Sequence, residues 1–247
     1  MMPTLSDSSS HWPRVTVVSV CRNALRALQS TAATVAALQY PALEYIVIDG
    51  ASLDGTLAYL RSAECPTTQW VSEPDKGIYD AMNKGVERAT GEWVIFMNAG
   101  DGFHAPDVLQ RLFSACQPAE ADVIYGDVVK QGRVKPASLP YNAHKMFFCH
   151  QSVLVRTELL RQFPFDTNYK MSADFKQVKQ LFKAGKRFVK VDVPVADFDT
   201  SGVSNAARSA GLRENIRVVR EVDGWLDQIR LLPRLLFVYY WCKWRGR

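Results

Sequence analysis

A short run of large apolar residues at 93–97 is followed at once by the polar sequence Asn-Ala-Gly-Asp, which ends at Asp101. An apolar run of this length is typical of a buried strand. The strand would deliver the Asp101 carboxylate to the edge where open α/β sheets bind ligands, and Gly100 would let a ligand approach the backbone closely. A carboxylate oxygen there suits Mg²⁺ or Mn²⁺ that bridges a diphosphate. The stretch therefore predicts a site for a nucleotide-linked sugar and its metal ion, with the amide of Asn98 beside it.

The N-terminal half alternates strand-like and helix-like segments. The expected strands are short, apolar runs at 15–20, 45–49, 70–71 and 93–97. The expected helices lie at 24–38, from 54–56 onward and at 77–89. β-Branched runs without polar alternation are typical of strands buried on both faces. The alternation predicts an α/β fold with a mostly parallel central sheet and helices on both faces.

The second half is less regular. Helices are expected at 105–116 and 172–184, and strands at 122–125, 127–134, 152–155 and 188–191. At 247 residues with 47% hydrophobic content, the chain can bury one large core. We therefore expect a flexible leader at 1–14, one nucleotide-binding domain at 15–205 and a basic, aromatic, helical C-terminal extension at 206–247.

Charge and cysteine content argue against several classes of protein. The five cysteines are scattered and lack CxxC spacing, which argues against a disulfide framework or a zinc site and favours a reducing cytosol. The net charge is +5, and the chain from Arg208 onward holds nine basic and four acidic residues. The body is therefore neutral, and the tail carries the excess. This distribution argues against nucleic acid as a partner and predicts one local basic surface.

The tail combines cations with aromatic residues. Its apolar run from Leu235 to Cys242 is far shorter than the roughly 20 residues that a membrane span needs. Tyrosine and tryptophan among cations are typical of segments that lie at a membrane surface, where the cations meet anionic lipids. We expect peripheral membrane contact through 231–247. The alternative is a C-terminal helix that packs on the body or on a second subunit.

Three further residues are expected to bind a nucleotide sugar. Asp49 ends a predicted buried strand, so we expect its carboxylate to be exposed at the sheet edge, where it can accept a hydrogen bond from a uracil or guanine ring. The alternative is a turn or helix-cap aspartate. Lys76 stands near a predicted helix start and can meet a phosphate there. Asp80 lies three and four residues before Asn83 and Lys84, so one helical face can present all three.

Transfer of a sugar to a hydroxyl requires a general base. The candidates in the second half are Asp166, Asp174, Asp197, Asp199 and His150. Asp174 is preferred because it stands at a predicted helix start, where it can face the cleft while the helix anchors it. The alternative is an aspartate that only complements the helix dipole. His150 and Gln151 precede a predicted strand and are either ligand contacts or an ordinary structural pair.

Taken together, these segments resemble the family 2 glycosyltransferases, a large group of inverting enzymes with a GT-A fold. The likeness is greatest to bacterial members that assemble capsule, O-antigen and exopolysaccharide. It covers residues 15–204 and rests on the order and spacing of VTVVSVCRN, YIVIDGASLDGT, SEPDKGIYDAMNKGVERATGEWVIFMNAGD, CHQSVLVR, FDTNYKMSADF and FDTSGVSN.

The resemblance implies a role for each matched residue. Asp49 would contact the base of a UDP- or GDP-linked sugar, with Ser19 on the first strand packed near it. Asp101 would coordinate the donor diphosphate through Mg²⁺ or Mn²⁺. Asp174 would be the general base that takes the proton of the attacking acceptor hydroxyl, with inversion at the anomeric carbon.

The implied enzyme is a metal-dependent glycosyltransferase that acts on a lipid-linked or other cell-surface glycan, with His150 and Gln151 on the acceptor side. It would be cytoplasmic and peripheral on the inner face of the cell membrane. Two positions depart from the family pattern. The metal motif lacks the first acid of a full DxD, since it reads Asn-Ala-Gly-Asp, and Ala173 stands where the family's catalytic pair has its first acid.

Three alternatives were weighed against this interpretation. A sugar nucleotidyltransferase would carry a glycine-rich loop after the first strand, but the sequence there is CRNALRAL. A dinucleotide-dependent oxidoreductase would need GxGxxG at the same place. A catalytically inactive scaffold in a membrane polysaccharide assembly is a different class, and the presence of Asp49, Asp101 and Asp174 argues against it.

Overall fold

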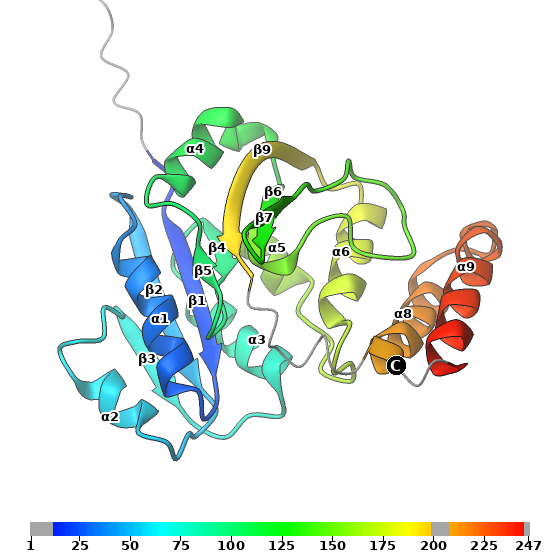
Figure 1. Ribbon diagram of the computed structural model, residues 1–247. Coiled ribbons are helices and arrows are strands. Elements are labelled where there is room, and N and C mark those ends of the chain that lie inside the picture. Colours follow the sequence, from blue (N-terminus) through cyan, green and yellow to red (C-terminus); the bar gives the residue numbers. More distant parts are fainter. Residues whose placement is uncertain (1–11, 199–207, 245–247) are drawn as a thin grey trace, which may run out of the picture.

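A single mixed sheet runs through the computed structural model, which describes residues 12–198 and 208–244. Helices cover both faces of the sheet, and a helical hairpin stands at one end (Figure 1). The strand order is β3-β2-β1-β4-β8-β6-β9-β5, with β7 paired to β6. The expected α/β class with helices on both faces is confirmed.

The first half of the chain forms the parallel part of the sheet. Its strands are β1 (Val15–Cys21), β2 (Leu43–Asp49), β3 (Gln69–Ser72) and β4 (Trp93–Phe96). The helices that connect them are α1 (Leu25–Ala36), α2 (Thr56–Arg61) and α3 (Ile78–Arg88). Since all four strands run in the same direction, their carboxyl ends meet at one edge, where ligands bind in such sheets.

The second half changes the strand directions. Its strands are β5 (Gly102–Phe103), β6 (Val123–Lys130), β7 (Arg133–Lys135), β8 (Val153–Arg156) and β9 (Phe188–Asp197). Its helices are α4 (Val108–Ala115), α5 (Thr157–Gln162) and α6 (Ala173–Lys183), with short 3₁₀ turns η1 (Pro118–Glu120) and η2 (His150–Ser152). Because β8 is antiparallel to both β4 and β6, the sheet is mixed rather than mostly parallel.

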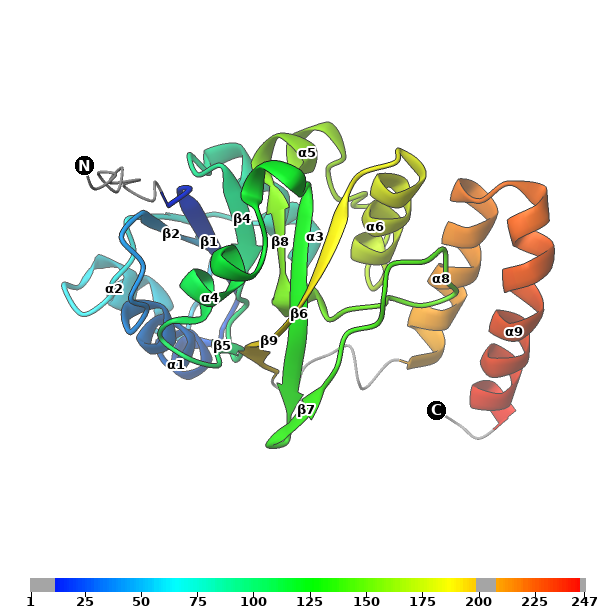
Figure 2. The same cartoon turned by 90° about the horizontal axis from the view of Figure 1, so that it is seen from above.

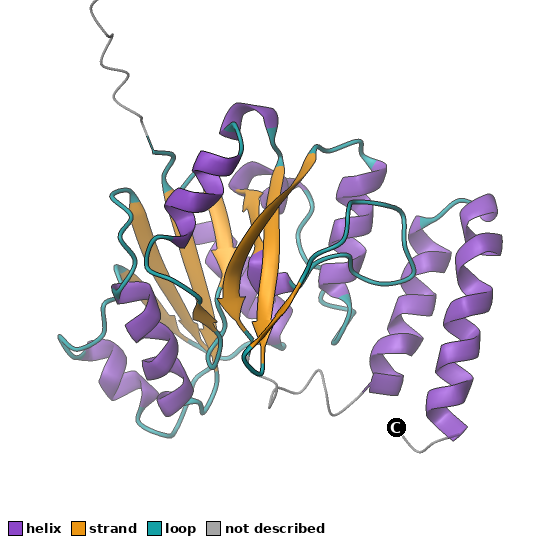
Figure 3. Ribbon diagram, turned by 45° about the horizontal axis from the view of Figure 1, so that its top comes forward, coloured by secondary structure: helices purple, strands orange, loops and turns teal. Residues whose placement is uncertain are grey.

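Two apolar cores fill the spaces between the sheet and its helices, as the layers in Figures 2 and 3 show. One core joins the sheet to α1, α2 and α4 through side chains such as Leu28 and Leu112. The other joins it to α3, α5 and α6, with Met82 and Phe175 among its fully buried members. Strands covered on both faces are nearly continuous in apolar side chains, which explains why β1 and β4 lack a regular polar alternation; the polar Thr16 and Ser19 of β1 are buried and hydrogen-bonded.

Strand β9 is longer than the sequence predicts. It continues past Val191 to Asp197 and contains Pro194, a residue that normally ends a strand. Pro194 pairs with Asp127 where the register between β6 and β9 shifts. A proline is tolerated at such an irregularity because the ladder hydrogen bond is already interrupted there. The curved end of β9 (yellow in Figure 1) then reaches β5 beside Asp101.

The C-terminal extension is an antiparallel hairpin of α8 (Arg208–Val222) and α9 (Trp225–Trp244). Helix α8 packs against α6, and α9 is the outermost helix at this end of the molecule (Figure 2). Leu231 and Leu235 of α9 are buried in the same core as α6. The predicted C-terminal helical appendage is therefore confirmed, while the division into domains at 14 and 205 stays a prediction.

Candidate active site

The loop that carries Asp101 is fixed by α1. The Thr31 hydroxyl donates to the Asp101 carbonyl oxygen at 2.6 Å, and the Gly100 amide donates to the Thr31 hydroxyl oxygen at 3.0 Å. The Asp101 amide closes a turn by donating to the Asn98 carbonyl at 2.9 Å. Asp101 is largely buried, with 6% of its surface exposed. The loop after β4 therefore holds the carboxylate in one place before any ligand arrives.

Gln151 connects Asp101 to the segment before β8. Its side-chain amide donates to Asp101 Oδ2 at 3.0 Å, and its amide oxygen lies 3.1 Å from the Cys149 thiol, which donates to it. The structure thus brings together two residues that are 50 positions apart in the sequence. Gln151 is expected on the acceptor side, and this contact joins it to the acid expected to bind the metal; a contact of Gln151 with an acceptor stays a prediction.

His150 lies on the opposite side of this short segment. Its ring stacks on Phe96 at 5.3 Å between centroids and meets the edge of Phe165 at 5.8 Å. Burial lowers the pKa of His150, and the nearby Asp174 carboxylate opposes this shift only in part. The imidazole is therefore neutral near pH 7. Its Nε2 atom is buried and has no hydrogen-bond partner among the described residues.

Asp174 stands in the first turn of α6, as the sequence predicts. The Tyr79 hydroxyl, on α3, donates to Asp174 Oδ1 at 2.9 Å. Burial and the Asp174 charge raise the pKa of Tyr79, so the phenol remains protonated and can only donate to the carboxylate. The loop before α6 is held to α3 as well, because Asn83 exchanges two hydrogen bonds with the Phe165 backbone at 2.8 and 2.9 Å.

A short series of side-chain contacts links the two acids. Gln151 donates to Asp101, and the ring of the adjacent His150 packs on Phe165. Phe165 in turn packs on Tyr79, whose hydroxyl donates to Asp174. The fold brings Asp101, from the parallel half, and Asp174, from the second half, to one neighbourhood.

A cavity of about 410 Å³ opens beside this neighbourhood, between the carboxyl edge of the parallel strands and the loop before α6. It is lined by Arg22, Asp75, Lys76, Gly77, Ile78, Tyr79, Asp80, Thr167, Tyr169 and Lys170. Three cations and two carboxylates in one cavity suit a ligand that carries both phosphate and hydroxyl groups. Lys76 and Asp80, both expected at the nucleotide sugar, lie in its wall.

Two of the three polar positions of α3 meet on one face as expected, since Asp80 Oδ2 lies 3.6 Å from Lys84 Nζ. Asp80 Oδ2 also accepts a hydrogen bond from the Lys76 amide at 3.0 Å. The Asn83 side chain turns toward the loop at Phe165. The helix therefore uses Asp80 to hold the turn that carries Lys76 and Asn83 to anchor the neighbouring loop.

Asp49 is fully buried, so the expected exposed carboxylate is wrong. Its oxygens accept hydrogen bonds from the Ser52 amide at 3.1 Å, the Ser52 hydroxyl, and the Ser72 hydroxyl at 2.6 Å. The Cys21 thiol also lies 3.7 Å from Asp49 Oδ1. The sequence places Asp49 correctly at the sheet edge, but these neighbours, which come from three other segments, cover it.

The neighbouring Gly50 shows what Asp49 does for the site. A side chain at Gly50 would collide with the Asp75 carboxylate in the cavity wall. The Asp49 carbonyl also accepts the Glu73 amide at 3.0 Å. Asp49 and Gly50 therefore set the path of the chain that carries Asp75 and Lys76, and a direct contact of Asp49 with a nucleotide base stays a prediction.

Ser19 is fully buried and lies away from the cavity lining. Its hydroxyl donates to the Met97 carbonyl and accepts from the Tyr45 hydroxyl at 3.1 Å. Both partners lie in the core on the α1 side of the sheet. The expected position of Ser19 next to a ligand is therefore wrong, because its hydroxyl is used inside the fold.

Asn98 offers an oxygen that suits a metal ion. Its Oδ1 atom is buried and has no hydrogen-bond partner among the described residues, which is unusual for a buried polar atom. Amide and carboxylate oxygens are the donors that Mg²⁺ and Mn²⁺ prefer. Within residues 12–198 and 208–244, no group of three metal-binding acids, histidines or cysteines forms a closed cage. Asn98 and Asp101 therefore fit an open site that substrate oxygens would complete.

The remaining base candidates have other partners. Asp166 accepts a hydrogen bond from Lys176 Nζ at 2.7 Å, and Asp197 lies 3.0 Å from His104 Nδ1 on the edge strand pair. Asp199 lies outside the described residues. Of the candidates, Asp174 combines the helix start with contact to a residue of the cavity wall.

Sequence reasoning missed Arg22, Asp75, Tyr79, Tyr169 and Lys170 of the cavity wall. Tyr79 and Asp75 stand inside the segment DKGIYDAMNKG. The sequence marks this segment as part of the site, but it does not distinguish these two residues from their neighbours. Tyr79 carries an apolar ring that packs against Phe165 at 5.5 Å, and apolar residues at this spacing usually indicate core. Only the structure shows that its hydroxyl reaches Asp174.

Comparisons with known proteins find relatives of this chain among the glycosyltransferases. The model of the family described as glycosyl transferase family 2 matches residues 16–180. An uncharacterised glycosyltransferase of Mycobacterium tuberculosis is 31% identical over 216 residues, which cover 83% of this chain and 82% of that protein. The amylovoran biosynthesis glycosyltransferase AmsB of Erwinia amylovora is 26% identical over 207 residues, covering 74% of this chain and 68% of its own.

Solved structures show the same fold. The mannosyltransferase PcManGT of Pyrobaculum calidifontis, in complex with GDP-mannose and Mn²⁺, superimposes with a TM-score of 0.68 at 22% identity. That alignment covers 87% of this chain and 66% of the mannosyltransferase. Residues 1–349 of TarS from S. aureus, in complex with UDP-GlcNAc, give a TM-score of 0.67 at 16% identity and cover 85% of this chain and 68% of that chain.

Proposed function

Because this chain belongs to glycosyl transferase family 2, we propose that it moves a sugar from a UDP- or GDP-linked donor to a hydroxyl of a lipid-linked or other cell-surface glycan, with inversion. The observation that supports the proposal is the set of contacts that joins the two acids: Gln151 donates to Asp101, the neighbouring His150 packs on Phe165, and Phe165 packs on Tyr79, whose hydroxyl donates to Asp174. One acid would face the donor diphosphate, and the other would face the acceptor. The solved relatives named above carry GDP-mannose or UDP-GlcNAc, which supports a nucleotide-sugar donor for this chain.

In this proposal Asp174 is the general base. It would accept the proton of the acceptor hydroxyl as that oxygen attacks the anomeric carbon and the bond to the nucleoside diphosphate breaks. The Tyr79 hydroxyl holds one oxygen of Asp174 at 2.9 Å, which leaves the other oxygen for the acceptor. Orientation of a base in this way, with proton transfer, contributes about 10²–10⁴-fold to a rate.

Asp101 and Asn98 would hold Mg²⁺ or Mn²⁺ together with the donor diphosphate. When bound, the metal would stabilise the negative charge of the departing nucleoside diphosphate. Gln151 supports this role, because its hydrogen bond to Asp101 Oδ2 orients the carboxylate. Arg22, Lys76 and Lys170 in the cavity wall would add positive charge beside the phosphates.

The experiment that tests this function uses the full chain and two readouts. Release of nucleoside diphosphate from UDP-glucose, UDP-GlcNAc and GDP-mannose, without acceptor, reports donor activation. Transfer to membrane glycolipid extracted from the source cells reports the whole reaction. Asp174→Asn should abolish transfer and leave nucleoside diphosphate binding intact. Unchanged transfer would reject the base assignment, and no release from any donor would favour an inactive scaffold.

The proposal includes peripheral membrane contact through the C-terminal hairpin, on the cytoplasmic face. None of the described helices is both long enough and apolar enough to cross a bilayer. Helix α9 is apolar on two faces: Leu231, Leu235 and Cys242 are buried on the body, and the outer face exposes large apolar and aromatic side chains. These exposed residues are Trp225, Leu226, Ile229, Phe237, Tyr240, Trp241 and Trp244.

This arrangement changes how membrane contact is tested. Deletion of 231–247 would remove Leu231 and Leu235 from the core, so loss of membrane binding could not be separated from unfolding. Packing on the body and membrane contact are also compatible, since they use different faces of α9. Substitution of exposed aromatic residues is the appropriate test.

A further inference from the structure

A second cavity, of about 430 Å³, lies between β6, β7 and the loop at 136–149. It is lined by Lys130, Lys135, Lys145, Phe147, Phe148 and Cys149, among others. None of the residues that line it also lines the cavity at Arg22 and Lys76. We call it the lysine cavity. No role in the proposed reaction has been given to it so far.

The lysine cavity gathers positive charge from three segments. Lys130 ends β6, Lys135 ends β7, and Lys145 comes from the loop. The described residues that line the cavity include no carboxylate, and none of the three lysines forms an ion pair with a described residue. By contrast, Lys176 and Lys183 elsewhere each pair with an acid at 2.8 Å or less. Like charges gathered without counterions repel each other, so an anion in this cavity would be stabilised.

The cavity is connected to the active site through Cys149. Cys149 and Lys130 line the same cavity, and the ammonium of Lys130 is held 4.0 Å from the centre of the Phe198 ring. The Cys149 thiol donates to the Gln151 side chain at 3.1 Å, and Gln151 donates to Asp101 at 3.0 Å. An anion held by these lysines would therefore lie beside the reaction centre.

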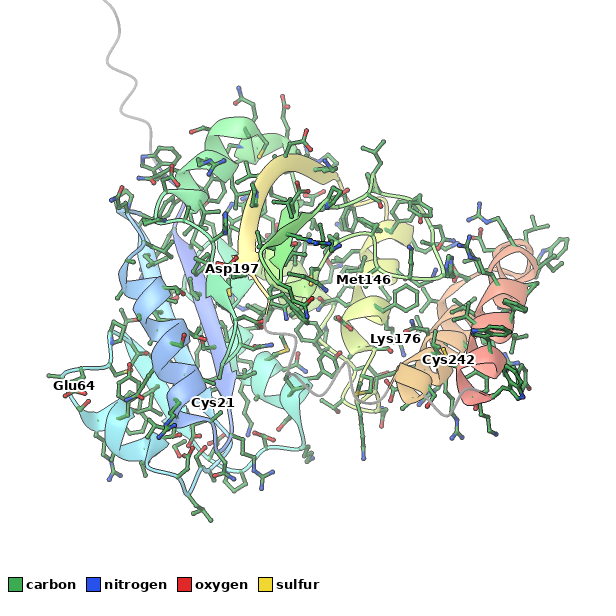
Figure 4. All side chains as sticks on the ribbon, viewed as in Figure 1. Cys21, Glu64, Met146, Lys176, Asp197 and Cys242 are labelled. Carbon is green, nitrogen blue, oxygen red and sulfur yellow. The ribbon has the colours of Figure 1, made fainter. Side chains whose placement is uncertain are left out.

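The other end of the loop reaches toward α9. Tyr141 and Asn142 line a cavity of about 310 Å³ together with Arg230 and Arg234 of that helix. A gap of only about 10 Å³, lined by Tyr141, Lys145 and Phe147 among others, shares residues with both cavities. The loop, which carries Met146 between the sheet and α6 in Figure 4, therefore borders hollows with basic and aromatic residues in their walls. The hollow at α9 is lined by Arg230 and Arg234, which stand beside the exposed stripe of that helix.

We propose that the lysine cavity binds the phosphate of the acceptor, so that the acceptor is a glycan carried on a lipid phosphate or diphosphate. The proposal rests on the proposed function. The three lysines would hold the phosphate, Phe147 and Phe148 would contact the adjoining apolar or sugar groups, and the acceptor hydroxyl would point toward Asp174. The lipid chain would lie along the outer surface of the loop, where Tyr141 is exposed beside Arg230 and Arg234 of α9, and the aromatic stripe of α9 would place this surface at the membrane.

The test measures binding of farnesyl phosphate to the full chain by calorimetry, with Mn²⁺ and saturating UDP or GDP present to fill the donor cavity. Inorganic phosphate and farnesol are the comparison probes. The test variant is Lys130→Gln, Lys135→Gln and Lys145→Gln combined. The matched control is Arg26→Gln, Arg61→Gln and Arg133→Gln combined, which removes three exposed cations and includes one on the same hairpin.

Farnesyl phosphate should bind the wild type and the control equally and should bind the lysine variant at least about tenfold more weakly, because each lysine removed takes away a charge-assisted contact. Farnesol should bind neither variant measurably. Donor hydrolysis should be the same in all three proteins.

Two binding results would contradict the proposal. If farnesyl phosphate binds the lysine variant as tightly as the wild type, the three lysines do not form a phosphate site. If inorganic phosphate binds as tightly as farnesyl phosphate, the acceptor is not recognised as a lipid phosphate. Absence of donor hydrolysis in the wild type would contradict the proposed function. The binding measurements do not depend on that activity, so they would still show whether the lysine cavity binds farnesyl phosphate.

Discussion

The Tyr79 hydroxyl donates a hydrogen bond of 2.9 Å to Asp174 Oδ1 and so joins α3, in the parallel half of the sheet, to α6, in the second half. Tyr79 also lines the proposed donor cavity. The base and the donor cavity are therefore connected by a single side chain. This contact provides the first test of the site.

Tyr79→Phe removes the hydroxyl and keeps the ring that packs on Phe165. A hydrogen bond to a charged group contributes about 1.5–3 kcal/mol, so we expect kcat to fall about tenfold or more. The Kd for UDP or GDP and the thermal midpoint should change little. Tyr79 acts here by positioning Asp174. If Tyr79→Phe loses much of its folding stability as well as kcat, the role of the hydroxyl is structural only.

Asp101→Asn should remove the effect of Mn²⁺ on nucleotide binding. The wild type should be stabilised by UDP or GDP more strongly with Mn²⁺ than with EDTA, because a ligand that binds the folded state raises its apparent stability. The amide of the variant is a weaker metal ligand than the carboxylate, so the difference should disappear. Gln151→Ala, which removes the partner of Asp101 Oδ2, should weaken metal affinity by about tenfold. A full Mn²⁺ effect in Asp101→Asn would contradict the metal assignment.

The exposed stripe of α9 should bind anionic lipid. Trp225→Ser, Phe237→Ser and Trp244→Ser combined should reduce binding to vesicles of phosphatidylglycerol and phosphatidylcholine by at least about tenfold, since each ring buried in the interface contributes about 1.5–3 kcal/mol. The control, Leu53→Ser, Val134→Ser and Leu139→Ser, removes three exposed apolar residues elsewhere. Co-sedimentation with the vesicles measures both. If vesicle binding falls equally in the two variants, the exposed stripe of α9 is not a specific membrane-binding face. If only the α9 variant changes its oligomeric state, the stripe binds a second copy of this chain instead.

The ion pair between Lys179 and Asp223 holds the C-terminal hairpin to α6. The two charged atoms lie 2.7 Å apart, and both side chains are nearly inaccessible to solvent. Asn142, from the loop of the lysine cavity, donates to Asp223 Oδ1 at 2.9 Å. Asp223→Ala leaves a buried ammonium without its partner and should lower the free energy of unfolding by about 3–5 kcal/mol.

Urea unfolding checks this value. The double variant Lys179→Met with Asp223→Leu should recover much of the loss, because it leaves no buried charge unpaired. A double variant as unstable as Asp223→Ala would show that packing, not charge, holds the hairpin.

Glu221 makes the same attachment sensitive to acid. Hydrogen bonds from Lys176 (labelled on α6 in Figure 4) at 2.8 Å and from Arg217 at 2.7 Å lower the pKa of Glu221 from its ordinary value of 4.5 to about 2. Because the folded-state pKa is the lower one, the stabilisation is complete above about pH 4.5 and is lost as the pH falls toward 2. Glu221→Gln should be less stable than the wild type at pH 6, and the difference should shrink between pH 4.5 and 3. A difference that stays constant over this range would contradict the assignment.

The sequence by itself determined the parallel half of the fold. The runs that become β1, β2 and β4 are buried on both faces, and strands of this kind are nearly continuous in apolar residues. The same runs located Asp101 at the carboxyl edge of the sheet, and the helix pattern located Asp174 at the start of α6. These predictions depend only on local sequence, which is why they could be made without the fold.

The tertiary structure decided how the polar residues are used. Ser19 and Asp49 stand where the sequence predicts but are buried, because Tyr45, Ser52 and Ser72 come from other segments and take up their hydrogen bonds. Tyr79 reaches Asp174 across 95 positions of sequence. Whether a polar side chain meets solvent, a ligand or another side chain depends on residues distant in the chain, and periodicity carries no information about those contacts.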